Sequence, residues 1–319
     1  YRPVSQVAVV ATNQWCRSGR RRRANHYVNE ARPARGWSLH ASDAQAPHPK
    51  AATLETTASD EETDVDLGLS GKRALVGGGA GGIGGGIAGA LAADGARLML
   101  VGRTAETLDA RAAELGASRV VADLATSDGP ASAVSAAVDE LGGLDLLVVN
   151  AGGPPAGTFE SLGEEEWQRA IDGTLQSTLR LIRAALPHLR EGSDPAIVIN
   201  LSSSVRQPIP GLTTSNVLRP GLAGLIKNLA FEIAPIRING VAPGRFATDR
   251  VRQLDTARAK ASGQSVEEVR RQAEASIPLG RYGDPAEIGR VAAFLLSPAA
   301  SYVTGAIVPV DGGLVSALP

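Results

Sequence analysis

Short runs of apolar residues alternate with Ala-rich stretches of helical spacing from Leu67 to the end of the sequence. Seven of these runs are typical of buried parallel strands, because they are short and almost wholly apolar. They are Arg73–Val76, Arg97–Val101, Arg119–Val121, Leu144–Asn150, Ala196–Leu201, Arg237–Val241 and Ile307–Val310. Apolar residues recur at helical spacing between them, as in Glu164–Leu189 and Asp284–Leu296. The pattern predicts an α/β fold with a doubly wound, seven-stranded parallel sheet and helices on both faces.

The first 66 residues lack this periodicity. Up to residue 50 they hold eight Arg and one Lys against two acidic residues, and the stretch from Ala51 to Asp66 is acidic with no basic residue. Such composition predicts a disordered tail, so we divide the chain into a tail (1–66) and one folded domain (67–319). The tail is interpreted as uninformative, as in a fragment or a mis-chosen start site. An organelle transit peptide and a nucleic-acid-binding segment are the alternatives.

Composition narrows the classes of partner. The formal net charge is -1, which does not indicate a nucleic-acid partner. Cys16 is the single cysteine, so a disulfide framework is excluded, and no cluster of His, Cys, Asp or Glu has metal-ligand spacing. No apolar stretch reaches 18 residues, which predicts a soluble protein without a transmembrane helix. We expect small-molecule and self partners, no metal, and a cytoplasmic location, with organelle import through the Arg-rich leader as the alternative.

A glycine-rich segment follows the first predicted strand directly. It runs Gly77-Gly78-Gly79-Ala80-Gly81-Gly82-Ile83-Gly84 and leads into a predicted helix that begins near Gly84. Glycines at this place let the backbone approach a pyrophosphate, whose charge the helix N-terminus favours. A flexible turn is the alternative in a glycine-rich protein. The position between strand and helix favours a dinucleotide site of Rossmann type.

The end of the second predicted strand indicates which dinucleotide binds. The chain reads Val101-Gly102-Arg103-Thr104 where the adenosine ribose is expected. A carboxylate there would hold the 2′-hydroxyl of NAD, whereas Arg103 can pair with the 2′-phosphate of NADP. The sequence therefore favours NADP over NAD as cofactor, with a solvated surface arginine as the alternative.

Taken together, these and later motifs resemble the short-chain dehydrogenase/reductase family, and within it the 3-oxoacyl-[acyl-carrier-protein] reductase-like members. Gly78, Gly82, Ile83 and Gly84 follow the family's glycine motif, with Gly77 at its Thr position. The other matches that imply contact with the cofactor are Asp123 and Leu124, Asn150, Ala151 and Gly152, and Pro243, Gly244 and Thr248. The C-terminal stretch from Gly280 to Gly313 also follows the family, and the matches cover about four-fifths of the chain.

The resemblance implies reduction of a carbonyl group with a Ser, a Tyr and a Lys four residues after the Tyr. Ser203 is the expected serine, with Ser202 as the second choice. The Tyr position holds Ser215 and the Lys position holds Arg219. The family's Asn on the preceding helix, which orders a proton-relay water, is Thr174. No other tyrosine of the chain is expected to replace the missing phenol.

These substitutions predict an altered site. Arg219 can still bind the nicotinamide ribose and supply positive charge, but it cannot relay a proton. Ser215 is shorter than Tyr and a weaker acid, so it needs an ordered water to deliver a proton. Arg206 and Arg245 follow predicted strands and are candidates for additional cations that contact an anionic substrate, although the sequence favours a surface arginine at each position. The charged segment 246–279 matches the family's variable lid.

Three hypotheses follow for the function. The first is an NADP(H)-dependent carbonyl reductase or alcohol dehydrogenase with an altered proton relay, acting on a small-molecule carbonyl such as a 3-oxoacyl thioester. The second is a nucleotide-binding sensor or partner subunit without turnover. The third is lyase or isomerase chemistry on the same scaffold, because fold does not fix function. The resemblance also implies a homo-oligomer, a dimer or tetramer, built through Glu164–Leu189 and Thr213–Ala234.

Overall fold

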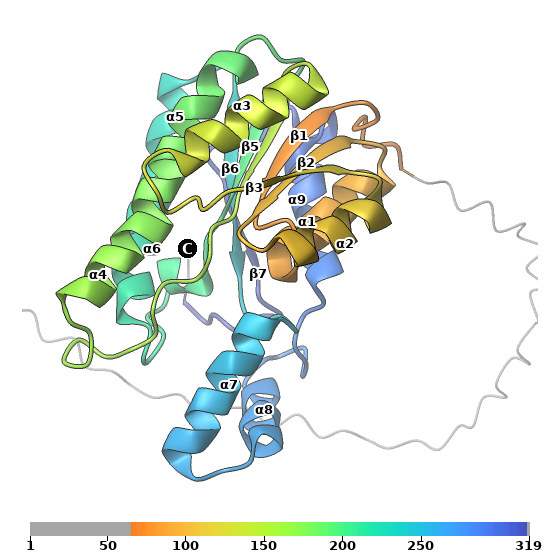
Figure 1. Ribbon diagram of the computed structural model, residues 1–319. Helices are drawn as coiled ribbons and strands as arrows, with labels where there is room; N and C mark the ends of the chain where they lie inside the picture. Colours follow the sequence, from red (N-terminus) through yellow and green to blue (C-terminus); the bar gives the residue numbers. More distant parts are fainter. Residues whose placement is uncertain (1–64, 318–319) are drawn as a thin grey trace, which may run out of the picture. The chain divides into compact units, whose positions relative to one another are not determined.

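The computed structural model describes residues 65–317, which form one seven-stranded, wholly parallel sheet (Figure 1). Its strands are β1 (Arg73–Gly77), β2 (Arg97–Gly102), β3 (Ser118–Val121), β4 (Leu146–Val149), β5 (Ala196–Asn200), β6 (Arg237–Pro243) and β7 (Ile307–Val310). The strand order is β3-β2-β1-β4-β5-β6-β7. The predicted doubly wound sheet is thereby confirmed, and the strand order reverses between β1 and β4. In such sheets the ligand crevice lies at this reversal, beyond the carboxyl ends of the strands.

Helices cover both faces of the sheet (Figure 1). On one face lie α3 (Gly129–Leu141), α5 (Ser177–Leu189) and α6 (Thr213–Glu232), and on the other α1 (Gly82–Ala93), α2 (Ala105–Leu115) and α9 (Pro285–Leu296). Beyond the carboxyl ends, α7 (Asp249–Ser262) and α8 (Val266–Ala275) form a helical pair from the predicted lid segment. The remaining short elements are α4 (Glu164–Ala170) and the 3₁₀ turns Ser203–Val205 and Pro298–Ala300.

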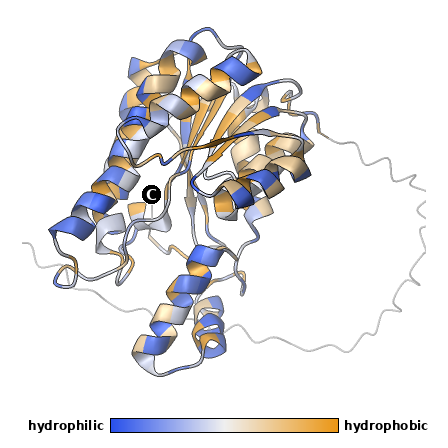
Figure 2. Ribbon diagram, viewed as in Figure 1, coloured by the Kyte–Doolittle hydropathy of each residue, from blue (hydrophilic) through white to orange (hydrophobic). Residues whose placement is uncertain are grey.

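The core consists of the two apolar layers between the sheet and its helices. The strands β1, β4, β5 and β6 are buried at nearly every position, because helices cover both of their faces. Their side chains alternate between the two layers: Leu75 packs toward α3 and α5, whereas Val76 packs toward α1 and α9. In Figure 2 the strands are apolar, and the helices are apolar on the side that faces the sheet and polar on the side that faces solvent.

The predicted helix 164–189 is interrupted. Between α4 and α5 the backbone forms a π-helical turn over Ile171–Gln176, which the apolar spacing did not predict. Single π turns within helices are frequent at functional sites, and this one carries Thr174. The helical axis continues, but the turn changes which face each later side chain presents.

The close packing of α1 on α9 depends on glycine. A Cβ on Gly86 would overlap the carbonyl of Pro285, and a Cβ on Gly289 would overlap the carbonyl of Gly86. The two helices therefore approach with backbone against backbone. This contact fixes the axis of α1, whose N-terminus faces the carboxyl edge of the sheet.

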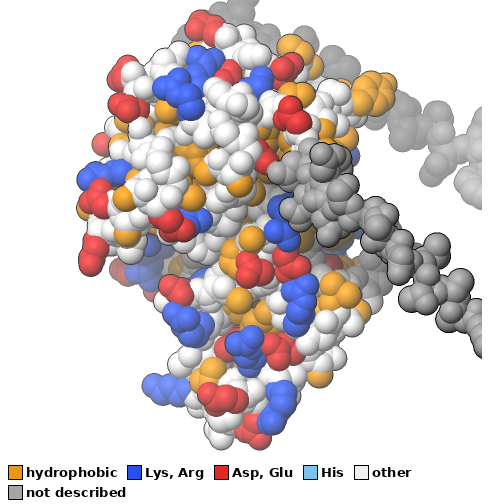
Figure 3. Space-filling model, turned by 90° about the vertical axis from the view of Figure 1, so that its right-hand side faces the viewer, with side chains coloured by type: hydrophobic (Ala, Val, Ile, Leu, Met, Phe, Trp, Pro, Cys, Tyr) orange, Lys and Arg blue, Asp and Glu red, His pale blue; other side chains and the backbone are white. Residues whose placement is uncertain are grey.

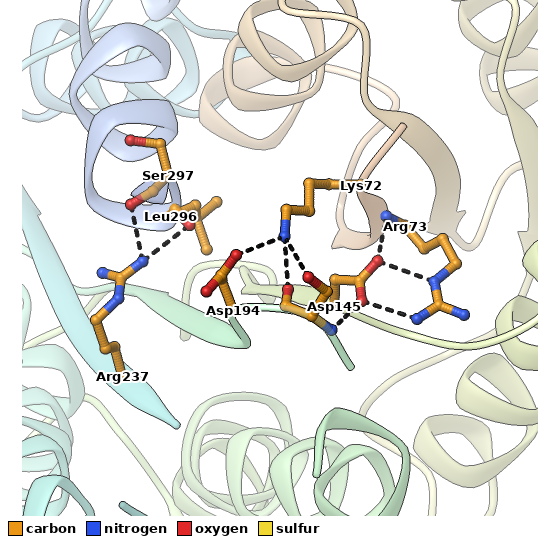
Figure 4. A network of polar contacts seen from close by, with 8 residues as sticks. Lys72, Arg73, Asp145, Asp194, Arg237, Leu296 and Ser297 are labelled. Carbon is orange, nitrogen blue, oxygen red and sulfur yellow. Dashed lines mark hydrogen bonds and ion pairs between the residues drawn. The ribbon is translucent and has the colours of Figure 1, made fainter. Parts of the chain in front are cut away.

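A polar network closes the amino end of the sheet, opposite the crevice (Figure 4). Asp145, which precedes β4, accepts hydrogen bonds from Arg73 Nε at 2.9 Å and Arg73 Nη2 at 2.8 Å. Burial raises the pKa of Asp145, but the Arg73 side chain and the backbone N–H groups of Arg73 and Ser193 outweigh it and hold the pKa at about 2. Arg237, at the start of β6, donates to the carbonyls of Leu295, Leu296 and Ser297 at the end of α9. These contacts tie β1 to the start of β4, and β6 to the end of α9.

Most of the predicted tail lies outside the described residues, as do the last two positions, so the division into tail and domain stays a prediction. Within residues 65–317, none of the helices has the length and apolar character needed to cross a membrane.

Candidate functional site

A cavity of about 800 Å³ opens at the carboxyl edge of the sheet. Residues that follow β1, β4, β5 and β6 line it, together with α6 and the α7–α8 pair. Of the predicted site residues, it brings together Gly78, Gly82, Ile83, Asn150, Ala151, Gly152, Ser202, Ser203, Ser215, Arg219, Pro243, Gly244 and Thr248. The strand-end positions singled out in the sequence therefore converge on one cavity at the reversal of strand order.

The glycine segment forms a tight cradle at the start of α1. Gly78 and Gly82 have φ of 59° and 54°, which favours glycine, and a Cβ on Gly84 would overlap the Gly78 carbonyl. Asn150 Nδ2 donates to the carbonyl of Gly77 at 3.0 Å, and Asn200 Nδ2 donates to Asn150 Oδ1 at 2.8 Å. Two asparagines thus hold the ends of β1, β4 and β5 in register around the cradle. Gly84 lies beneath it, outside the cavity lining.

The adenosine end of the predicted site lies beside this cavity. Arg103 follows β2 and is exposed, and among the described residues its side chain has no hydrogen-bond or ion-pair partner. Asp123 follows β3, the strand beside β2, and its Oδ1 accepts from the backbone N–H of Ala125 at 2.9 Å. Leu124 is buried beneath. These three residues do not line the cavity, but they adjoin one another at the sheet edge where an adenosine is expected.

Thr248 caps α7. Its Oγ1 accepts from the backbone N–H of Val251 at 3.3 Å, as an N-cap residue does, so the predicted nicotinamide loop and the first turn of α7 are one unit. Gly244 N donates to Val310 O at 2.9 Å, which anchors the loop to β7.

Three serines after β5 are arranged differently from one another. Ser202 and Ser203 both lie on the cavity wall. Ser202 Oγ accepts from the backbone N–H of Ser204 at 3.1 Å, so it caps the short 3₁₀ turn. Ser204 turns away from the wall, and its Oγ lies 3.1 Å from Ser215 Oγ. The sequence analysis did not single out Ser204, because only the side-chain geometry shows which of three adjacent serines reaches α6.

Arg219 lies on α6, one turn after Ser215, and is 8% exposed. Its Nη1 donates to the carbonyls of Asn200 at 2.7 Å and Leu201 at 2.6 Å, where β5 ends. A guanidinium carries five N–H donors, so the donors of Arg219 that these two bonds leave unused stay available on the cavity side. Among the described residues, no carboxylate pairs with Arg219. Burial and the nearby Arg250 lower the pKa of Arg219 to about 10, so it stays cationic at neutral pH.

Thr174 lies outside the cavity lining, on the π turn. It is buried, and its Oγ1 has no hydrogen-bond partner in the described part of the chain. Asn200 Oδ1, on the cavity side, is the other buried oxygen there without a partner. Buried oxygens of this kind are usually satisfied by a ligand or an ordered water. The predicted water-ordering role of Thr174 stays a prediction.

Neither tyrosine of residues 65–317 lines the cavity. Tyr302 is fully exposed. Tyr282 is buried; its hydroxyl donates to Asp255 Oδ2 at 2.8 Å and accepts from Arg245 Nε at 3.1 Å. Burial and the bond to Asp255 raise the pKa of Tyr282. Its phenol is therefore committed to a network that holds α7 in place.

The arginines near the cavity differ from the expected ones. Arg206 is not among the lining residues, and Arg245 lines the cavity but pairs with Asp255 and Tyr282. Arg250 instead reaches across the mouth, where its Nη2 donates to the carbonyl of Pro154 at 2.7 Å. The sequence could not distinguish Arg250 from the other charged residues of the lid, because a charged residue on a helix is usually solvated.

Comparison with known proteins gives consistent matches over the described domain. A family model described as enoyl-(acyl carrier protein) reductase matches residues 78–315. The 3-oxoacyl-[acyl-carrier-protein] reductase FabG of Thermotoga maritima is 33% identical over 77% of this chain and 99% of that protein.

Solved structures agree with this. The crystal structure of L-sorbose reductase from Gluconobacter frateurii complexed with NADPH and L-sorbose is 30% identical, with a TM-score of 0.76 over 80% of this chain and 100% of that one. The NADPH-bound structure of a short-chain oxidoreductase from Pseudomonas aeruginosa PAO1, described as containing an atypical catalytic center, is 30% identical, with a TM-score of 0.71 over 78% and 99%.

Proposed function

The chain belongs to the short-chain dehydrogenase/reductase family of oxidoreductases, and we propose that it is an NADP(H)-dependent enzyme that reduces a carbonyl group or oxidises the corresponding alcohol. The family expected from the sequence motifs is thereby confirmed. One observation carries the proposal: the buried cation Arg219 lines the same cavity as Ser203, Ser215 and the glycine cradle.

The residues present fit a nicotinamide dinucleotide. Gly78 and Gly82 adopt positive φ, and the backbone N–H groups at the start of α1 have no side-chain cap, so they are available for a pyrophosphate. Arg103 is exposed and unpaired among the described residues, with no carboxylate at the end of β2 to oppose a 2′-phosphate. Gly244 and Thr248 would hold the nicotinamide end, while Asn150, bonded to Gly77 O and Asn200, would keep the glycine cradle in shape. NADPH in the family's solved structures supports the choice of NADP over NAD.

The bound nicotinamide would supply or accept a hydride at the substrate carbon. Ser203, on the cavity wall, is placed to donate a hydrogen bond to the substrate oxygen. The charge of Arg219 would stabilise the negative charge that develops on that oxygen, and burial of the guanidinium strengthens this interaction. Ser215, whose hydroxyl is hydrogen-bonded to that of Ser204 at 3.1 Å, would orient a water in the cavity that passes the proton from solvent. Loss of the phenol is expected to slow this step about 10²- to 10⁴-fold relative to a tyrosine enzyme.

A non-catalytic cofactor sensor or partner subunit is the second candidate. It is favoured by one observation, the absence of any described tyrosine from the cavity lining. The two candidates share the cofactor site and differ only in whether the site turns over.

The test combines binding and turnover on the full chain. We expect NADPH to bind more tightly than NADH in a fluorescence titration, and Arg103→Ser to remove that difference without weakening NADH. We also expect oxidation of NADPH with at least one member of a panel of 3-oxoacyl thioesters, sugars and simple ketones. Binding without oxidation across the panel supports the sensor, and equal affinity for NADH contradicts the choice of cofactor.

A further inference from the structure

The charges that face the cavity are strongly unbalanced. The charged side chains of its described lining are Arg219, Arg245, Asp249, Arg250 and Arg258. The one acid among them, Asp249, is mostly exposed and pairs with Arg252 Nη2 at 2.6 Å. Arg245 is paired with Asp255. In the described structure, three arginines therefore face the cavity without an acidic partner.

Two of these arginines influence each other. Arg250 lies near enough to Arg219 to lower the pKa of that buried guanidinium, and no anion between them offsets the repulsion. Partial burial lowers the pKa of Arg250 itself. Its Nη2 bonds only a neutral carbonyl, that of Pro154. Two neighbouring cations without an anion are unfavourable, and a bound anion relieves this cost.

On the side of α7 that faces the cavity, basic and apolar residues alternate at helical spacing. Arg250, Leu254 and Arg258 are four residues apart and lie on one face of the helix, with Val251 beside them. The lining also contains the apolar residues Ile209, Leu212 and Leu314. Figure 3 shows that basic and acidic side chains are interspersed on the outer surface at the height of α7 and α8. The unbalanced positive charge is thus a property of the cavity side.

Position separates Arg250 from the groups assigned to the cofactor. It is two residues beyond Thr248, and its guanidinium passes over Gly153, where a Cβ would lie 3.1 Å from Arg250 Nε. It therefore bridges the β4 and β6 loops at the mouth of the cavity, whereas the glycine cradle lies at the start of α1. A substrate between Ser203 and the mouth would present its far end to Arg250.

We propose that the substrate is an anionic carbonyl compound, whose carboxylate or phosphate is bound by Arg250 at the cavity mouth while its reacting oxygen faces Ser203 and Arg219. The inference rests on the proposed reductase function and names its substrate class. A planar guanidinium binds either oxyanion through paired hydrogen bonds, and the apolar wall accommodates the carbon skeleton between the two ends.

The test compares matched ligands on the chain saturated with NADP⁺. The probes are 3-hydroxybutanoate against its methyl ester, and glycerol 3-phosphate against glycerol, each measured by calorimetry. We expect one anion to bind about 10- to 100-fold more tightly than its neutral counterpart, as for a charged hydrogen bond. Arg250→Gln should remove that difference and leave the neutral ligand and NADPH unaffected.

The matched control is Arg271→Gln, on the neighbouring helix α8 and outside the cavity lining, which should leave the preference intact. Equal affinity for anion and neutral ligand overturns the proposal. So does a loss of NADPH affinity in Arg250→Gln, because Arg250 would then serve the cofactor. Preferential anion binding without turnover supports this inference while rejecting the reductase function, and turnover of neutral ketones without anion preference does the reverse.

Discussion

Arg219, at the position where the family resemblance predicts a lysine, makes contacts that a lysine would not make. A lysine offers a compact charge on a flexible stem, whereas Arg219 is fixed at the end of β5 by two bonds from one nitrogen to Asn200 O and Leu201 O. The remaining donors of its fork are thereby aimed rather than free to rotate. In the proposed mechanism this pre-organised cation stabilises an oxyanion but supplies no proton at neutral pH.

Placing the family's Tyr and Lys at positions 215 and 219 tests whether the site lacks a proton donor but retains charge stabilisation. In Ser215→Tyr combined with Arg219→Lys, the phenol regains general acid catalysis, so we expect kcat to rise about 10²- to 10⁴-fold on a substrate that the native chain accepts. Steady-state NADPH oxidation measures it. Ser215→Phe with Arg219→Lys is the matched control, which fills the same space without a hydroxyl. An equal kcat in the two double variants, with NADPH affinity retained, contradicts the proposed cause of slow turnover.

At the scale of elements, the sequence predicted the parts that depend on local pattern. The strands β1, β4 and β5 follow from their continuous apolar runs, and the glycine turn follows from its place after β1. The π turn at Ile171–Gln176 was missed, because the apolar spacing on either side of it is still helical.

Side-chain pairing across elements was beyond the sequence. Arg245, just before the lid segment, and Arg250, within it, look alike in the sequence, yet Arg245 is neutralised by Asp255 whereas Arg250 reaches the carbonyl of Pro154. Pairing of this kind depends on how α7 sits over the sheet, which residue spacing does not determine. For the same reason, the sequence could not show that Ser204, and not Ser203, contacts Ser215.

The network at the amino end of the sheet predicts an acid-dependent stability. Because the pKa of Asp145 is lowered from 3.8 to about 2 on folding, its contribution is complete above pH 3.8 and is lost as the pH falls toward 2. Asp145→Asn should therefore reduce the free energy of unfolding at pH 7 by on the order of 2 kcal/mol. The difference from the native chain should shrink between about pH 4 and pH 2.

Urea unfolding at several pH values measures this, with Asp194→Asn as control. Asp194 lies at the same end of the sheet, but its carboxylate is 64% exposed and pairs with Lys72, so its loss should have little effect. A pH-independent difference between the Asp145→Asn variant and the native chain would show that packing, not charge, is responsible.

For the whole molecule, we propose a homo-oligomer, as the sequence analysis expected. Large apolar side chains are exposed on α6, with Phe231 at 86% and Val217 at 55%. Light scattering should give the mass of a dimer or tetramer, and Phe231→Glu should shift it toward a single chain if this face is the interface. A native chain that is already monomeric at micromolar concentration rejects the proposal.

The proposed function requires that a site with a buried arginine, and with no tyrosine of residues 65–317 in its lining, still transfers a hydride. The most direct measurement is a reaction with NADPH carrying deuterium at the transferable position of C4, followed by mass spectrometry of the product alcohol. We expect one deuterium on the former carbonyl carbon, at a rate that Arg219→Ala lowers strongly while the chain stays folded and binds NADPH. Product without deuterium, or an unchanged rate in Arg219→Ala, contradicts it.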